Sequence, residues 1–123
     1  MHILFVDDTF ETRDLFRLCF TLEGHTVETA HNGLEALRII EQSAVAVDVI
    51  IMDYHMPGMS GLEVVQHLRQ IENLSPTPII LFTGDAKGKF EHQAQELGVA
   101  RVIYKPILPA ELIAVAREVL EEI

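Results

Sequence analysis

Acidic, hydroxyl and amino side chains directly follow the short apolar runs of this 123-residue chain. Asp7 and Asp8 follow the first run, Asp53 the third, Thr83 the fourth and Lys105 the fifth. Carboxylates bind cations, whereas a hydroxyl and an ammonium donate hydrogen bonds to phosphoryl oxygens. If the fold brings these residues together, their types indicate phosphoryl chemistry at a carboxylate.

Three carboxylates that lie close together need a cation between them. At an effective dielectric constant of 20, two like charges about 4 Å apart repel by about 4 kcal/mol. Oxygen ligands without His or Cys select Mg²⁺ or a similar ion, which one or two carboxylates and a phosphate usually hold. Lys105 and Thr83 would then contact other phosphoryl oxygens. These charges match a phosphorylated carboxylate.

The apolar runs are predicted to be buried parallel strands. They are short, rich in β-branched and aromatic residues, and apolar on both faces. The predicted strands are Ile3–Val6, Val49–Met52, Ile79–Phe82 and Val102–Tyr104. A more polar run, His25–Thr29, is expected at the edge of the sheet.

Amphipathic segments between the runs predict helices. The residues expected to face the core are Leu15, Leu18, Cys19 and Leu22 in the first helix and Leu112, Val115, Ala116 and Val119 in the last. Ser60 and Glu63 form a capping box that opens another helix, and Pro109 opens the last one. The segment Ala86–Leu97 is expected to be the least stable helix, because its apolar positions are few and Gly88 interrupts it.

Alternating strands and helices predict an α/β fold. Five strands and five helices with right-handed crossovers give a doubly wound parallel sheet covered on both faces. We expect residues 1–123 to form one domain. Ligands of such sheets bind at the carboxyl ends of the strands, where the winding direction reverses. The polar residues that follow the runs are therefore expected at that edge.

Composition restricts the partners and the compartment. Nine basic against 19 acidic residues give a formal net charge of −10, which disfavours direct binding to nucleic acid or anionic lipid. No apolar run approaches the roughly 18 residues of a membrane span, and no charged leader precedes the first run. The lone Cys19 cannot form an internal disulfide, which is typical of a reducing interior. We expect a cytoplasmic protein without a membrane or nucleic-acid partner.

Four motifs, in order and spacing, resemble the receiver domain of two-component response regulators, including the chemotaxis regulators. They are VDD at 6–8, DYHMPGMSG at 53–61, TG at 83–84 and KP at 105–106. The resemblance covers the whole chain and implies a flavodoxin-like sheet with strand order 2-1-3-4-5. It also implies a signalling phosphoacceptor rather than an enzyme, one that catalyses only its own phosphotransfer and slow autodephosphorylation.

The resemblance further implies an acceptor and a metal site. Asp53 would accept a phosphoryl group from a phosphohistidine. Mg²⁺ would be bound by Asp53, by Asp8 directly, by Asp7 mostly through water, and by the backbone carbonyl of His55.

Phosphoryl-binding, switch and lifetime residues are implied in the same way. Thr83 and Lys105 would hold the phosphoryl group, and Thr83 with Tyr104 would form the conformational switch. His55 and Asp85, each two residues beyond a motif residue, would tune the lifetime of the phosphorylated state.

The implied partners are proteins. The donor would be a histidine kinase or a histidine phosphotransfer protein, and the recipient a downstream protein target or an effector domain. Whether the chain acts alone or belongs to a longer regulator is left open. A cis peptide between Lys105 and Pro106 is also expected from the resemblance.

Three alternatives compete with this interpretation. A phosphatase of the haloacid dehalogenase type would need a second Asp where His55 stands, and a cap domain for which 123 residues leave no room. A flavin-binding flavodoxin would need a phosphate loop where Asp7 and Asp8 would repel phosphate. A receiver that serves only as a binding module would have no need of the intact acidic, hydroxyl and amino set.

Overall fold

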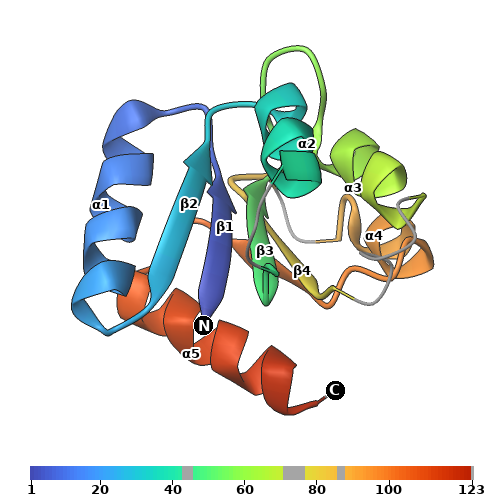
Figure 1. Ribbon diagram of the computed structural model, residues 1–123. Helices are drawn as coiled ribbons and strands as arrows, with labels where there is room; N and C mark the ends of the chain where they lie inside the picture. Colours follow the sequence, from blue (N-terminus) through green and yellow to red (C-terminus); the bar gives the residue numbers. More distant parts are fainter. Residues whose placement is uncertain (43–45, 71–76, 86–87, 123) are drawn as a thin grey trace.

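The computed structural model consists of strands and helices that alternate along the chain (Figure 1). It describes residues 1–42, 46–70, 77–85 and 88–122. The strands are β1 (His2–Val6), β2 (Thr26–Ala30), β3 (Val49–Asp53), β4 (Ile79–Thr83) and β5 (Arg101–Tyr104). The helices are α1 (Phe10–Leu22), α2 (Gly33–Gln42), α3 (Gly61–Arg69), α4 (Glu91–Glu96) and α5 (Pro109–Glu121).

The strands form one parallel sheet in the order β2-β1-β3-β4-β5, which confirms the predicted fold class and strand order. The central strands β3 and β4 are buried along their whole length, because each is apolar on both faces. The more polar β2 lies at an edge, as its composition predicted.

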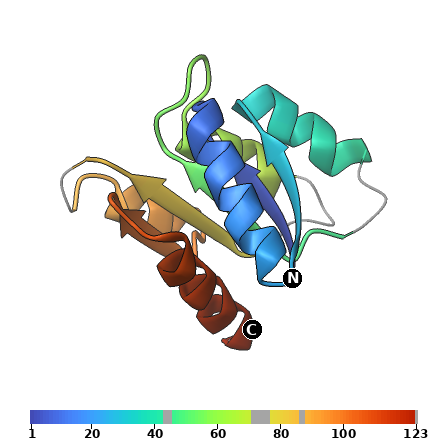
Figure 2. The same cartoon turned by 90° about the vertical axis from the view of Figure 1, so that its left-hand side faces the viewer.

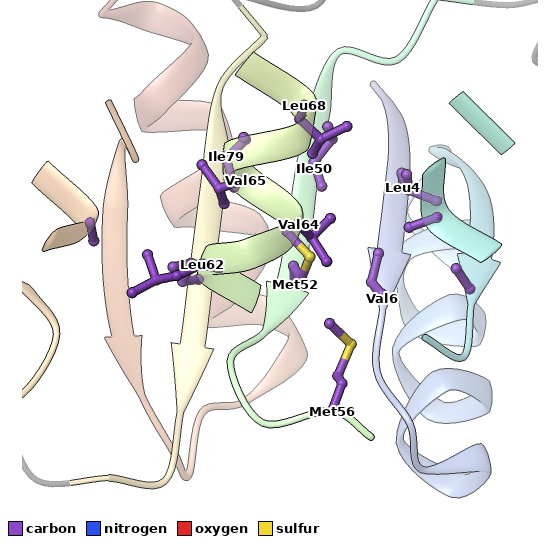
Figure 3. Close-up of a cluster of buried hydrophobic side chains, with 14 of the residues drawn as sticks. Leu4, Val6, Ile50, Met52, Met56, Leu62, Val64, Val65, Leu68 and Ile79 are labelled. Atoms are coloured by element: carbon purple, nitrogen blue, oxygen red, sulfur yellow. The ribbon is translucent and has the colours of Figure 1, made fainter. Parts of the chain in front are cut away.

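Helices cover both faces of the sheet, so alternate residues of β1 enter different cores. Ile3 and Phe5 pack with α1 and α5, which lie together on one side (Figures 1 and 2). Leu4 and Val6 pack on the other side, against residues of α2 and α3. Figure 3 shows this second cluster, in which Met56 from the loop after β3 also takes part. The loop that follows β3 is therefore anchored in the core.

The predicted inner face of α1 is wrong. Three leucines of the predicted stripe are about half exposed or more: Leu15 (52%), Leu18 (49%) and Leu22 (77%). Phe16 and Phe20 are buried instead, and their ring centroids lie 5.0 and 5.9 Å from that of Phe5. Both stripes have helical spacing, and the aromatic stripe is the one that buries more apolar area.

The predicted helices that correspond to α3 and α5 are confirmed in their main features. In α5, Leu112, Ala116 and Val119 are buried, whereas Val115 is only partly buried. At the start of α3, Ser60 Oγ accepts a hydrogen bond from the Glu63 amide, and the Glu63 carboxylate accepts one from the Ser60 amide. These reciprocal bonds are the predicted capping box.

The helix predicted over 86–97 is shorter in the structure. Residues 86–87 lie outside the described part of the chain, and α4 begins at Glu91 after Phe90. Gly88 has a φ of +90°, a left-handed conformation that a helix cannot contain. Across the described residues, we find no helix with the length and apolar content needed to span a bilayer.

Candidate functional site

Acidic residues from two neighbouring strands meet at the carboxyl edge of the sheet. Asp7 follows β1, and Asp53 is the last residue of β3, which pairs with β1. One carboxylate oxygen each from Asp7, Asp8 and Asp53 lies within 4.8 Å of the other two. Asp7 and Asp53 are buried, with 1% and 4% of their surfaces exposed, whereas Asp8 is exposed. The structure thus brings together the three acids that the sequence singles out.

Lys105 supplies positive charge to this acidic cluster. Its Nζ donates a hydrogen bond of 3.1 Å to Asp53 Oδ2 and lies 4.0 Å from Asp7 Oδ2. The backbone amide of Lys105 donates to the carbonyl of Thr83 at 2.8 Å, which holds the loop after β5 at the sheet edge. The peptide bond between Lys105 and Pro106 is cis, as the resemblance predicted.

The two carboxylate oxygens of Asp7 differ in their hydrogen bonding. Its Oδ1 accepts from the Thr9 amide at 2.7 Å, but the buried Oδ2 has no hydrogen-bond partner within the part of the chain that the structure describes. Burial raises the pKa of Asp7 above 3.8, and the carboxylates of Asp53 and Asp8 add to this, against the Thr9 amide and Lys105. A cation between the three acids would satisfy Oδ2 and relieve the repulsion, so the donor set fits a metal ion.

Thr83 is the last residue of β4, and its side chain is fully buried. The Thr83 hydroxyl donates to Asp85 Oδ2 at 3.3 Å, and the Asp85 amide donates back to Thr83 Oγ1 at 3.1 Å. The hydroxyl that the sequence assigns to phosphoryl binding is therefore directed at a neighbouring carboxylate.

His55 and Asp85 contact each other across the site. His55 Nε2 is bonded to Asp85 Oδ2, and the His55 backbone amide donates to Asp53 Oδ1 at 3.2 Å. Lys89 Nζ lies 3.9 Å from Asp85 Oδ1. The hydrogen bond from His55 lowers the pKa of Asp85, and the charges of His55 and Lys89 contribute in the same direction. The sequence placed His55 and Asp85 near the site, but it did not indicate this contact.

Tyr104 ends β5 beside Thr83 in the sheet register. Its hydroxyl donates to the carboxylate of Glu91, in the first turn of α4, and accepts from the Gly88 amide at 3.3 Å. The bond to Glu91 raises the pKa of Tyr104. Sequence reasoning missed Glu91, because an acidic residue in a first helical turn is already explained by the helix dipole.

Two further features connect the end of β3 to its surroundings. The Tyr54 ring stacks on Phe90 with centroids 3.6 Å apart, which links the loop after β3 to the start of α4. Gly61 lies so close to β3 that an added Cβ would be 2.8 Å from the Asp53 carbonyl oxygen. The motif glycine at this position therefore lets α3 begin directly against the end of β3.

Comparisons with known proteins show similarity to one family over most of the chain. A family model described as the response regulator receiver domain matches residues 3–117. The chain is 33% identical over 118 residues to the transcriptional regulatory protein CpxR homolog of Haemophilus influenzae, covering 96% of this chain and 49% of that protein. It is 32% identical to chemotaxis protein CheY-3 of Vibrio cholerae, covering 91% and 85%. The chain thus spans about half the length of the CpxR homolog.

A solved structure shows the same likeness in three dimensions. The chemotaxis response regulator CheY4 of Vibrio cholerae superposes with a TM-score of 0.88 at 30% sequence identity, covering 96% of this chain and 97% of that one.

Proposed function

The chain belongs to the response regulator receiver domain family of two-component phosphoacceptors, and we propose that Asp53 is its phosphoacceptor and that residues 1–123 act as one receiver domain. The observation that carries the proposal is the environment of Asp53. Its carboxylate lies among two other acids and 3.1 Å from the Lys105 ammonium, at the edge of the sheet where ligands of this fold bind. Family membership also sets aside the phosphatase and flavin-binding alternatives.

Mg²⁺ is the cofactor we infer for the acidic cluster. Asp8 would bind it directly, Asp7 mostly through water, and Asp53 and the backbone carbonyl of His55 would complete the protein ligands. The buried Oδ2 of Asp7, which has no hydrogen-bond partner among the described residues, supports the assignment, as does the purely oxygen donor set. When bound, the ion neutralises charge on the acids and on phosphoryl oxygens.

The proposed reaction is the attack of an Asp53 carboxylate oxygen on the phosphorus of a phosphohistidine. A P–O bond forms as the P–N bond breaks, and the electron pair of that bond stays on the imidazole nitrogen. Lys105 holds one phosphoryl oxygen by charge, and the Thr83 hydroxyl donates a hydrogen bond to another. Catalysis by this chain then consists of positioning and electrostatic stabilisation.

Thr83 and Tyr104 are the residues we assign to the switch. Phosphorylation adds nearly two negative charges at Asp53, and it acts at a distance by favouring one of two arrangements. When Thr83 turns toward the phosphoryl group, it vacates space beside Tyr104. The short helix α4, which contacts Tyr104 through Glu91, then moves at low cost.

His55 and Asp85 are the residues we assign to the lifetime of the phosphorylated state. They contact each other beside Asp53, and the resemblance to receiver domains implies that a hydrolytic water would approach past them. Slow autodephosphorylation of the protein is part of the same proposal, and the identities of these two side chains would set its rate.

The proposed partners follow from this role. A histidine kinase or a histidine phosphotransfer protein would be the donor, and a downstream protein or an effector domain would receive the signal. Direct nucleic-acid binding by this chain is disfavoured by its formal charge of −10. A cytoplasmic location, inferred from the lone Cys19, stays a prediction.

Phosphorylation by a small donor tests the proposal. The protein is incubated with acetyl phosphate and Mg²⁺, and intact-mass spectrometry measures the gain of one phosphoryl group. We expect labelling of the wild type, none of Asp53→Asn, and normal labelling of Asp14→Asn, the same substitution at an exposed aspartate of α1. Equal labelling of the wild type and Asp53→Asn would contradict the assignment.

A further inference from the structure

The hydroxyl of Thr83 has a single hydrogen to donate. In this structure it donates that hydrogen to Asp85 Oδ2, while Thr83 Oγ1 accepts a hydrogen bond from the backbone amide of Asp85. Two bonds thus join residues that are only two positions apart. A hydroxyl that donates to Asp85 cannot at the same time donate to a phosphoryl oxygen on Asp53.

Side chains from two different segments hold the Asp85 carboxylate in place. His55, in the loop after β3, binds its Oδ2, and Lys89, before α4, lies 3.9 Å from its Oδ1. The Asp85 side chain is only 24% exposed, so most of its surface is withdrawn from water. Asp85 is therefore a positioned acceptor rather than a freely rotating surface acid.

We propose that Asp85 is a positioning residue that competes with the phosphoryl group for the Thr83 hydroxyl, and thereby sets how tightly the site holds that group. This inference rests on the proposed function, in which Thr83 binds a phosphoryl oxygen. An ionised acceptor binds a hydroxyl more strongly than a neutral amide of the same shape. Asp85→Asn should therefore weaken the competitor while it preserves the size of the side chain.

A second effect of Asp85 must be separated from the first. Its negative charge also repels a phosphoryl group, whatever the Thr83 hydroxyl does. The two effects differ in one respect, because competition requires the hydroxyl and repulsion does not. Thr83→Val removes the hydroxyl at nearly constant volume in a fully buried position, so a double-mutant cycle distinguishes them.

The experiment measures the affinity of beryllium fluoride, a stable phosphoryl analogue, in saturating Mg²⁺ by isothermal titration calorimetry. The proteins are the wild type, Asp85→Asn, Thr83→Val and the double variant, with thermal unfolding to confirm that each is folded. Asp85→Asn is expected to bind about threefold to tenfold more tightly than the wild type, the range of one hydrogen bond. In the Thr83→Val background, the same substitution should change the affinity less than about twofold.

Glu96→Gln provides the matched control for net charge. Glu96 is an exposed residue of α4 that pairs with His92, and its substitution should leave the affinity unchanged. An equal gain from Asp85→Asn with and without the hydroxyl would overturn the proposal in favour of simple repulsion. Equal affinities of the wild type and Asp85→Asn would overturn it while the proposed function stands. Absence of binding by the wild type would overturn both.

Discussion

Asp7 is an ionisable residue with almost no contact with solvent. Its neighbours Asp53 and Asp8 are also acidic, and one of its own oxygens has no hydrogen bond among the described residues. Without a bound cation, the ionised form of Asp7 therefore opposes folding. This cost is the reason that the pKa of Asp7 is raised.

Asp7→Asn should therefore stabilise the metal-free protein. The side-chain amide of Asn keeps an oxygen that can accept the hydrogen bond from the Thr9 backbone amide, and the substitution removes the charge. We expect the melting temperature to rise by a few degrees at neutral pH, since each kcal/mol is worth roughly 3 to 6 °C in a domain of this size. Circular dichroism in a chelator measures the shift.

The pH dependence of this gain has a definite sign. A carboxyl group with a raised pKa favours folding when protonated, and this contribution is lost as the pH rises through the folded-state pKa. The wild type and Asp7→Asn should therefore differ most at neutral pH. They should converge below pH 3.8, the ordinary pKa of the group. A variant that melts below the wild type at neutral pH would refute this account of Asp7.

The motif spacing indicated the candidate site residues but did not reveal all of their partners. Asp7, Asp53 and Lys105 lie at or just beyond the carboxyl ends of strands, so their convergence follows from the topology of a parallel sheet. The bond between His55 and Asp85 joins two loops, and it depends on side-chain rotamers that spacing does not encode. For that reason the competition for the Thr83 hydroxyl emerges only in three dimensions.

At the level of secondary-structure elements, α1 shows where sequence periodicity is insufficient. Two stripes one position apart both repeat at helical spacing, and one contains leucines while the other contains Phe16 and Phe20. A hydrophobic pattern predicts that a helix has an inner face, but the partner surface decides which stripe it is. Here Phe5 of β1 supplies an aromatic surface that accepts the two rings.

Paired truncations on α1 test which face is buried. Phe20→Ala removes a fully buried ring and should lower the free energy of unfolding by about 3–5 kcal/mol. Leu18→Ala, on the same helix but 49% exposed, should cost less than about 1 kcal/mol. Urea denaturation followed by circular dichroism gives both values. If the two variants lost similar amounts of unfolding free energy, the assignment of the phenylalanine face of α1 as the buried face would be wrong.

At the scale of the whole molecule, the order of the strands explains why the acidic residues gather at one edge of the sheet. β1 lies between β2 and β3, so the chain reverses its winding direction beside β1. Asp7 follows β1 and Asp53 ends β3, so the two residues come together at that point although they are 46 positions apart. This feature was predictable, because strands that are apolar on both faces are central, and ligands of such sheets bind at the reversal.

The formal charge of −10 destabilises the folded chain through repulsion between its acidic residues. Any salt therefore stabilises the protein to some extent, whether or not a metal site is filled. Added salt screens the repulsion between surface acids and stabilises the fold without specific binding. Mg²⁺ does the same, and in addition it should bind the acidic cluster of the folded state. Only the second effect depends on Asp8, which is exposed and can be changed at little cost to the fold.

We therefore expect Mg²⁺ to raise the melting temperature more than NaCl at equal ionic strength. A ligand at ten times its dissociation constant adds about 1.4 kcal/mol, which corresponds to several degrees here. In Asp8→Asn, Mg²⁺ should raise the melting temperature no more than NaCl does, while the rise caused by NaCl itself persists. Asp14→Asn removes an equal charge from the exposed surface of α1 and should keep the full excess. If Asp8→Asn also keeps it, Mg²⁺ stabilises the protein by screening alone, and the acidic cluster is not its binding site.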